Sequence, residues 1–152
     1  MSKFKIYAKS IFIPLIIGAL VGFIISGTID YNTLKKPVFS PPSIAFPIVW
    51  AILYILMGIS YGILKEKSLL NPKINLIYYS QLFVNALWSI FFFNLKWRFF
   101  AFIWILLLLS LVIIMIVDFY KQNKIAGLLQ IPYLLWIAFA TYLNLAVYLL
   151  NR

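Results

Sequence analysis

The sequence predicts an all-α integral membrane protein, with a single bundle of five transmembrane helices formed by residues 1–152. Hydrophobic residues make up 65% of the chain, and its mean hydropathy is +1.04. The charged side chains are few, 13 Lys and Arg and 3 Asp and Glu. A soluble domain exposes far more charge than this. The charged residues also divide the chain into five uncharged stretches, each long enough to cross a bilayer, which takes about 20 residues.

The uncharged stretches set the expected helices. They cover residues 10–29, 37–64, 74–95, 99–117 and 125–151. We therefore expect helices at about 8–29, 43–64, 74–95, 99–120 and 125–150. A membrane β-barrel would need alternating segments of about 9–11 residues, which runs of this length do not resemble.

The first stretch follows three lysines and so also resembles a signal peptide. It is longer than a typical signal-peptide core and lacks an Ala-x-Ala site at its end. Gly18, Gly22 and Ser26 are spaced by four, as in the faces through which membrane helices pack closely. Gly58 and Gly62 repeat that spacing in the second helix. These faces are compatible with a homodimer, but we favour packing within the chain.

The second stretch is too long for one helix and opens with a proline-rich segment. Residues 37–42 read Pro-Val-Phe-Ser-Pro-Pro, which cannot form a regular helix. We expect a non-helical first loop that ends near Ser43, with Pro47 in or just after the first turn of the next helix. The later connections are expected to be tight, at Asn71-Pro72, Lys96-Trp97-Arg98 and residues 121–124.

The distribution of cations weakly favours one membrane orientation. The N-terminus, second loop and fourth loop hold eight Lys, and the other side holds five Lys and Arg: Lys35, Lys36, Lys96, Arg98 and Arg152. Because cytoplasmic loops carry the excess of Lys and Arg, we expect a cytoplasmic N-terminus. The net charge of +10 is explained by these flanking clusters and anionic lipid headgroups, so nucleic acid is not expected as a partner.

Polar and aromatic residues form stripes along three of the expected helices. They are Trp50, Tyr54 and Gly58; Gln81, Asn85, Trp88 and Ser89; and Pro132, Trp136, Ala140 and Asn144. A polar side chain within a span needs a protein partner, a cavity or a ligand. One interpretation is that Asn85 and Asn144 are hydrogen-bond partners between helices and that the aromatic residues only pack. The other is a pocket whose aromatic walls suit a flat, conjugated ligand.

Several chemistries are excluded by composition. The chain has no His and no Cys, which removes imidazole bases, thiolate nucleophiles and the usual metal ligands, so no metal site is expected. Asp118, at the end of the fourth expected helix, is the only acid expected near a span, so a ring of carboxylates for ion conduction is also missing.

Three blocks of sequence resemble the TspO/MBR family of tryptophan-rich sensory proteins and translocator proteins. The first runs from Lys36-Pro37 through Pro41-Pro42 to Pro47-Ile48-Val49-Trp50 and Tyr54. The others are Asn85-Ala86-Leu87-Trp88-Ser89 in helix three and Pro132-Tyr133 with Trp136, Ala140 and Asn144 in helix five. They occur in the family's order over about residues 30–150.

The resemblance implies a five-helix bundle whose proline-rich first loop covers a ligand pocket as a lid. The implied ligand-binding residues are Trp50, Tyr54, Asn85, Trp88, Trp136, Ala140, Pro41 and Pro42. Family members bind porphyrins such as protoporphyrin IX, sterols in some cases, and synthetic benzodiazepines. Some bacterial members are reported to degrade protoporphyrin in light, which would make Trp50 and Trp136 candidate catalytic residues.

We therefore expect a membrane receptor or sensor for porphyrins, with light-dependent degradation as its candidate activity and no cofactor besides the ligand. A carrier of porphyrin or another amphipathic molecule is the alternative, although five helices cannot be halved into inverted repeats. The third hypothesis is a structural or regulatory subunit, in which the aromatic stripes only pack against other helices and bind no ligand. Leu145, Tyr148 and Arg152 match a weak sterol motif, and the expected location is a bacterial plasma membrane.

Overall fold

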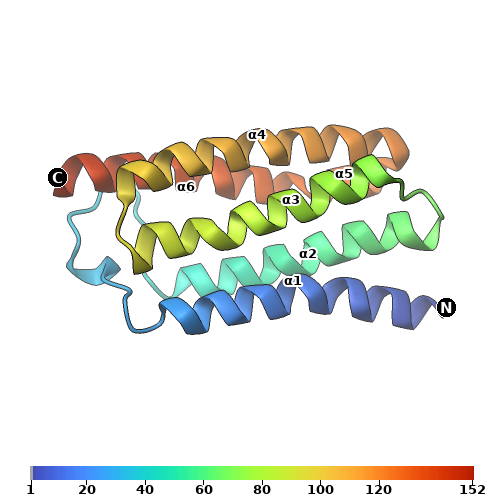
Figure 1. Cartoon of the computed structure of the whole chain (residues 1–152), viewed down its shortest axis with the longest axis horizontal. Coiled ribbons are helices and arrows are strands. Elements are labelled where there is room, and N and C mark those ends of the chain that lie inside the picture. Colours follow the sequence, from blue (N-terminus) through green and yellow to red (C-terminus); the bar gives the residue numbers. More distant parts are fainter. Residues whose placement is uncertain (1) are drawn as a thin grey trace.

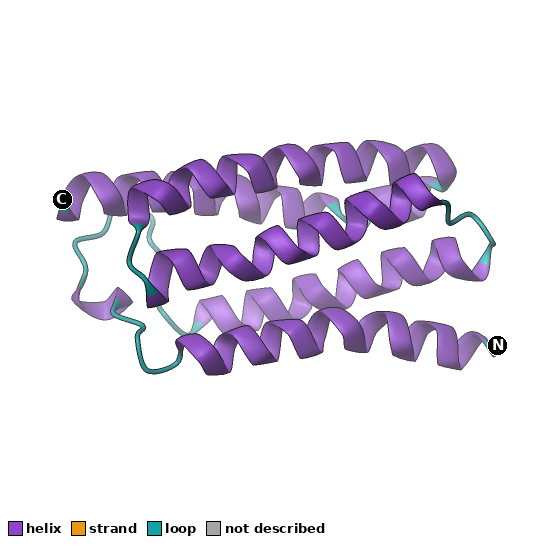
Figure 2. Ribbon diagram, in the orientation of Figure 1, coloured by secondary structure: helices purple, strands orange, loops and turns teal. Residues whose placement is uncertain are grey.

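The computed structural model describes residues 2–152, and over that range it is helical without any strand (Figures 1 and 2). The elements are α1 (Lys3–Ile25), η1 (Tyr31–Thr33), α2 (Ala45–Glu66), α3 (Pro72–Ser89), η2 (Ile90–Asn94), α4 (Arg98–Gln122), α5 (Lys124–Leu128) and α6 (Ile131–Asn151). Within these residues, five helical segments are long and apolar enough to span a membrane; η2 extends α3, and α5 and α6 together form the last. The predicted fold class is confirmed.

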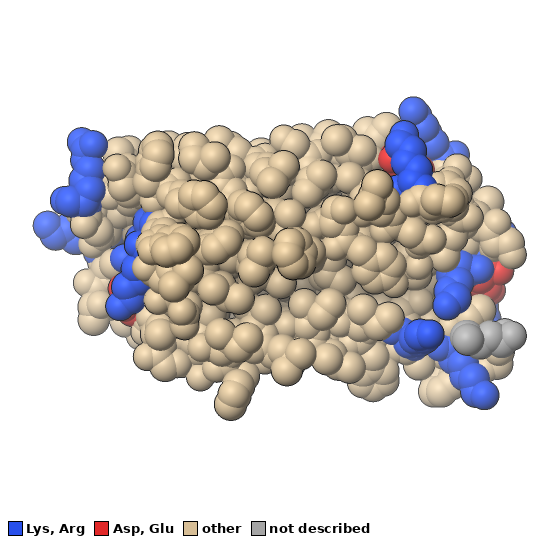
Figure 3. All heavy atoms as spheres, viewed as in Figure 1, with Lys and Arg blue, Asp and Glu red and all other residues tan. Residues whose placement is uncertain are grey.

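The spans lie side by side along the long axis of the molecule, and the chain reverses direction between them (Figure 1). The largest contacts join α1 to α2, and α4 to α3 and to α6. The centre is apolar and closed, with side chains such as Met57, Leu108 and Ile137 fully buried. Lys and Arg gather at the two ends and leave an uncharged band between them (Figure 3), which matches a bundle with hydrocarbon around its middle.

Helix α1 begins and ends earlier than the predicted 8–29. Its N-terminus is capped by Ser2, whose Oγ accepts from the Lys5 amide at 3.3 Å, so the helix includes the lysines before the apolar run. At the other end, the hydroxyls of Ser26 and Thr28 donate to the backbone carbonyls of Phe23 and Ile25, both at 2.8 Å. Such local bonds compete with helix continuation, so α1 stops at Ile25.

Small residues bring α1 and α2 into close contact. A Cβ at Gly58 would lie 2.5 Å from Ile11 Cα on the α1 backbone, and one at Gly62 would lie 2.7 Å from the Tyr7 ring. A Cβ at Gly18 would overlap the Tyr54 ring. The prediction that these faces pack within the chain is confirmed for these three glycines. It is wrong for Gly22, where a Cβ would meet no atom within 4 Å.

The observed breaks between helices agree with the predicted ones and coincide with prolines and capping residues. Helix α2 begins at Ala45, two residues later than expected, so Pro47 lies in its first turn as predicted. Asn71 caps α3 through Oδ1, which accepts from the Ile74 amide at 2.9 Å, and Pro72 is the first helical residue. Helix α4 covers Arg98–Gln122, within two residues of the expected 99–120.

The third and fifth spans contain irregularities that the predicted ranges did not. The end of the third span is a π-helix, in which the Leu95 amide donates to the Ile90 carbonyl at 2.9 Å. The expected helix at 125–150 is interrupted after Leu128. Pro132 explains the interruption, because its ring would collide with the carbonyl four residues earlier and it has no amide hydrogen to donate.

Candidate functional site

A cavity of about 650 Å³ lies at the end of the bundle where the first loop crosses. This volume is within the range of small-molecule sites, about 300–1,000 Å³. Helix α1 lines it with Leu15, Gly18, Ala19, Val21, Gly22 and Ile25; the loop with Ile29, Tyr31, Asn32, Ser43 and Ile44; α2 with Phe46, Pro47, Trp50, Ala51 and Tyr54; and the third span with Ser89 and Phe93. The lining is mostly apolar, with few polar groups.

Aromatic rings form the α2 wall of this cavity. Trp50 stacks on Tyr54 with ring centres 5.5 Å apart and an interplanar angle of 27°. One turn earlier, Phe46 meets the edge of Tyr31 from the loop at 5.0 Å. The spacing of four places Phe46, Trp50 and Tyr54 on one helical face. This wall presents flat surfaces against which a planar ligand can stack.

Trp136 lies behind this wall and does not line the cavity. Its ring is perpendicular to that of Trp50, with centres 6.4 Å apart, and it also contacts Phe46 at 5.7 Å. The Trp136 Nε1 is buried and has no hydrogen-bond partner among the described residues. The two candidate catalytic tryptophans are therefore in contact, and Trp50 is the one that faces the cavity.

A chain of hydrogen bonds leads from the cavity wall into the core. The Tyr54 hydroxyl donates to Asn85 Oδ1 at 2.8 Å, and Asn85 Nδ2 donates to the Tyr133 hydroxyl at 2.6 Å. The Tyr133 hydroxyl in turn donates to Gln81 Oε1 at 2.7 Å. The chain joins α2, α3 and α6. Asn85 is buried and positions Tyr54 rather than lining the cavity.

Trp88 and Asn144 form a second buried pair. Trp88 Nε1 donates to Asn144 Oδ1 at 2.9 Å, and Asn144 Nδ2 donates to the Arg98 carbonyl at 2.8 Å. Asn85 and Asn144 thus both form hydrogen bonds between helices, but they do not bond to each other. Ala140 is buried nearby on α6. Neither Trp88 nor Ala140 lines the cavity, so a direct ligand contact by these residues stays a prediction.

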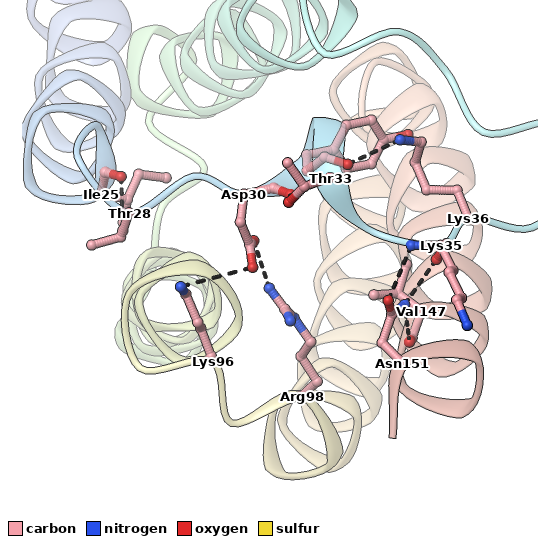
Figure 4. Close-up of polar contacts among 11 residues, drawn as sticks. Ile25, Thr28, Asp30, Thr33, Lys35, Lys36, Lys96, Arg98, Val147 and Asn151 are labelled. Atoms are coloured by element: carbon pink, nitrogen blue, oxygen red, sulfur yellow. Dashed lines mark hydrogen bonds and ion pairs between the residues drawn. The ribbon is translucent and has the colours of Figure 1, made fainter.

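The first loop is tied to the opposite side of the bundle. Asp30 forms an ion pair with Arg98 at 2.6 Å and a longer one with Lys96 at 3.8 Å (Figure 4). The Lys35 amide donates to Asn151 Oδ1 at 3.0 Å, and Asn151 Nδ2 donates back to the Lys35 carbonyl at 2.8 Å (Figure 4). These bonds hold the loop across the mouth of the cavity to α4 and α6.

Tyr31 fixes the fold of the loop itself. Its hydroxyl donates to the Pro41 carbonyl at 2.6 Å, and Lys36 Nζ donates to the Tyr31 carbonyl at 2.9 Å. Burial raises the pKa of the Tyr31 phenol above its usual range, so the phenol stays a neutral donor. Pro41 and Pro42 do not line the cavity. Pro41 shapes the lid through its carbonyl, and contact with a ligand stays a prediction for both.

A sequence model of the TspO/MBR family matches residues 10–150. The chain belongs to this family. The tryptophan-rich protein TspO of Archaeoglobus fulgidus is 39% identical over 154 residues and covers 99% of each chain. Protein CrtK of Rhodobacter capsulatus is 32% identical over 99% of this chain and 94% of its own. The human translocator protein is 34% identical over 78% of this chain and 72% of its own.

Part of the cavity in this TspO/MBR chain had no separate signal in the sequence. Phe46 could have been identified as a wall residue, because it precedes Trp50 and Tyr54 at the same spacing of four residues. Gly22 had the spacing of a packing residue, and only the tertiary structure shows that it faces open space. Phe93 reaches the cavity from the π-helix η2, an irregularity that helical periodicity does not reveal.

Proposed function

We propose that this TspO/MBR protein is a membrane receptor for a flat, apolar ligand of the porphyrin class, which binds in the cavity under the first loop. The observation that supports the proposal is the stacked Trp50–Tyr54 wall, which lines the cavity opposite glycines of α1. Gly18 packs against the Tyr54 ring, but Gly22 borders open space, and this space beside the flat rings suits a planar molecule. Two of its relatives are named tryptophan-rich protein TspO and translocator protein, and these are names of a membrane sensor and translocator family.

Metal-free protoporphyrin IX fits this site better than haem does. The sequence has no His or Cys to serve as an axial iron ligand. The hydroxyls of the cavity tyrosines, Tyr31 and Tyr54, already donate to the Pro41 carbonyl and to Asn85. The cavity instead offers stacking surfaces and the hydroxyl of Ser89. The protein's contribution would be to position the tetrapyrrole and to exclude water from it.

The test is a titration with protoporphyrin IX in the dark, followed by tryptophan quenching in detergent. Gly22→Phe is the informative variant, because Gly22 lines the cavity and a Cβ there has no described atom within 4 Å, so the added ring has room to occupy ligand space. Gly27→Phe is the matched control, since its Cβ also meets nothing within 4 Å but Gly27 does not line the cavity. We expect saturable micromolar binding that Gly22→Phe weakens at least about tenfold and Gly27→Phe leaves unchanged.

The outcomes separate a pocket from partition into the micelle. Quenching that is linear in porphyrin, or equal in the wild type and both variants, contradicts the proposal. Equal weakening by both variants would also contradict it, because the effect would not depend on the cavity. A thermal unfolding scan of each variant confirms that loss of binding is not loss of fold.

A second candidate function is light-dependent degradation of the bound porphyrin. The contact between Trp50 and Trp136 favours it, because a bound porphyrin is its own photosensitiser and Trp50 would be the first electron donor next to it. Trp136, edge-on at 6.4 Å, would be the second donor. Dioxygen would be the oxidant, with both of its atoms ending in the cleaved porphyrin, and the electron lent by the indoles would return to them, so the protein would supply the pocket and no net electrons.

Transport of porphyrin or another amphipathic molecule is the alternative for the same cavity, and a homodimer is a further expectation; neither has a structural observation in its favour here. The proposed location is a bacterial plasma membrane, and the proposed orientation has the N-terminus in the cytoplasm. The support for the orientation is the distribution of cations, with eight on the N-terminal side of the bundle and five on the other.

The sterol motif of Leu145, Tyr148 and Arg152 stays a prediction. Its Leu145 is exposed on the lipid-facing surface of α6.

A further inference from the structure

A second cavity lies at the start of α4, apart from the one under the first loop. Its volume is about 430 Å³. It is formed where the tight turn between the third and fourth spans meets the end of α6, and no residue of the first cavity contributes to it. Its lining includes Lys96, Arg98 and Arg152, together with Phe99, Phe100 and Tyr148.

The charges in this cleft are positive. Asp30 is the one described acid in ion-pair distance of the cleft's cations, and it binds both Arg98 and Lys96. Arg152 is exposed and forms no ion pair with the part of the chain that the structure describes. Three cationic side chains stand against the Asp30 carboxylate, and they still leave a net positive charge when the α-carboxylate of Arg152 is counted. A cleft of this kind attracts an anionic group.

Hydrogen-bond donors in the cleft are also left without acceptors. Trp97 precedes α4 and makes no side-chain cap, so the first amides of this helix, which belong to Arg98 and its two successors, have no acceptor within the helix. The Arg98 side chain is 12% exposed, and its Nε is buried without a partner among residues 2–152. The free amides at the start of α4 support the positive side chains and match the oxygens of a phosphate group.

The other walls of the cleft are aromatic and face outward. Phe99 is 55% exposed and Phe100 45% exposed, and Tyr148 packs against Phe99 with ring centres 5.3 Å apart. The cleft is lined by Lys96, Arg98 and Arg152, and Lys and Arg gather at the two ends of the uncharged band (Figure 3). Cations beside exposed aromatic rings at this depth match a lipid, whose headgroup is charged and whose chains are apolar.

We propose that this cleft binds the phosphate headgroup of an anionic phospholipid, with the acyl chains running along Phe99 and Phe100. The Arg152 side chain is the first contact for the phosphate, and Lys96 is the second, because its ion pair with Asp30 is long at 3.8 Å, whereas Asp30 holds Arg98 at 2.6 Å. The site is independent of the cavity under the loop, and it would stand whether or not that cavity binds porphyrin.

The test is quenching of tryptophan fluorescence by phospholipids with brominated acyl chains, added to the full-length protein in detergent. Trp97 lines the cleft and is the local reporter. We expect brominated phosphatidylglycerol to quench saturably and phosphatidylcholine with the same chains to bind at least about tenfold more weakly. Each cation near an anionic headgroup strengthens binding about fivefold, so Lys96→Gln with Arg152→Gln should remove most of this preference.

The matched control is Lys121→Gln with Lys124→Gln, which removes two exposed lysines at the other end of the bundle. It should keep the preference for phosphatidylglycerol, whereas Trp97→Phe should remove the saturable part of the signal. Equal loss in both double variants would overturn the proposal, because the preference would then reflect total charge. Displacement of the lipid by 50 mM inorganic phosphate, but not by chloride at the same ionic strength, would overturn the lipid assignment in favour of free phosphate.

Discussion

The Tyr54 hydroxyl donates to Asn85 Oδ1 at 2.8 Å inside the bundle. Through this bond, a residue of the cavity wall is coupled to a buried asparagine that does not reach the cavity. Tyr54 also stacks on Trp50, so the bond fixes the plane against which a flat ligand would lie. Hydrogen bonds between membrane helices contribute about 0.6–2 kcal/mol, enough to hold one rotamer without dominating the stability of the bundle.

The first prediction concerns this pair. Tyr54→Phe and Asn85→Leu should each lower the free energy of unfolding, and a double-mutant cycle should give a coupling energy of about 0.6–1.7 kcal/mol. The measurement is reversible unfolding in mixed micelles. Thr141→Val combined with Tyr54→Phe is the control, because Thr141 bonds only to the Ile137 carbonyl and should be additive. A coupling energy of zero for Tyr54 and Asn85 would contradict the role assigned to the bond.

The second prediction compares two glycines of the first two helices. Gly58→Ala should destabilise the protein by about 1–3 kcal/mol, because the added Cβ would lie 2.5 Å from Ile11 Cα and 2.6 Å from the Ser10 carbonyl oxygen. Gly22→Ala should be neutral or stabilising by up to about 1 kcal/mol, since it meets nothing. Thermal unfolding of both variants in one detergent measures this, and equal melting temperatures would refute it.

The third prediction concerns light. If the porphyrin is degraded in the cavity, Trp50→Phe should slow the loss of porphyrin absorbance under illumination more than Trp136→Phe does, because only Trp50 lines the cavity. The double variant should be slowest. Trp97→Phe is the control, since Trp97 lies outside that cavity and is 53% exposed. Degradation by the double variant at the wild-type rate would show that neither indole donates.

The fourth prediction concerns the loop that covers the cavity. Asp30→Asn removes the ion pairs with Arg98 and Lys96, and a hydrogen bond to a charged group contributes about 1.5–3 kcal/mol. Because this contact ties the loop to α4, we expect porphyrin to dissociate several-fold faster in stopped-flow experiments. Glu66→Gln, which removes the ion pair with Lys3 at the far end, should leave the dissociation rate unchanged. A rate unaffected by Asp30→Asn would mean that the loop does not limit ligand exit.

The fifth prediction tests orientation. The chain has no Cys, so a single introduced Cys reports its own position. With the N-terminus in the cytoplasm, a membrane-impermeant maleimide added to intact cells should label Val38→Cys but not Gln122→Cys. Both positions are exposed and lie at opposite ends of the bundle. Lysed cells should show labelling of both variants, and the reverse pattern in intact cells would show the opposite orientation.

Long-range packing decided which predicted residues share a cavity. Helical spacing identified Trp50, Tyr54, Asn85 and Trp88 as special, because a period of 3.6 residues places them on the inner faces of their helices. It did not distinguish a wall residue from one that is hydrogen-bonded behind the wall. The α6 partners of Asn85 and Trp88, which are Tyr133 and Asn144, are separated from them by more than forty residues of sequence.

The sequence by itself determined the class of fold, the number of spans, their approximate limits and the family. Hydrocarbon outside the bundle forces each span to satisfy its own backbone, so long uncharged stretches between charged ones translate directly into helices. The tertiary structure alone decided that Gly22 faces a cavity while Gly58 faces a backbone. It also decided that the start of α4 and the end of α6 form a cationic cleft. These features depend on how helices distant in sequence are placed side by side, which the pattern within one helix does not contain.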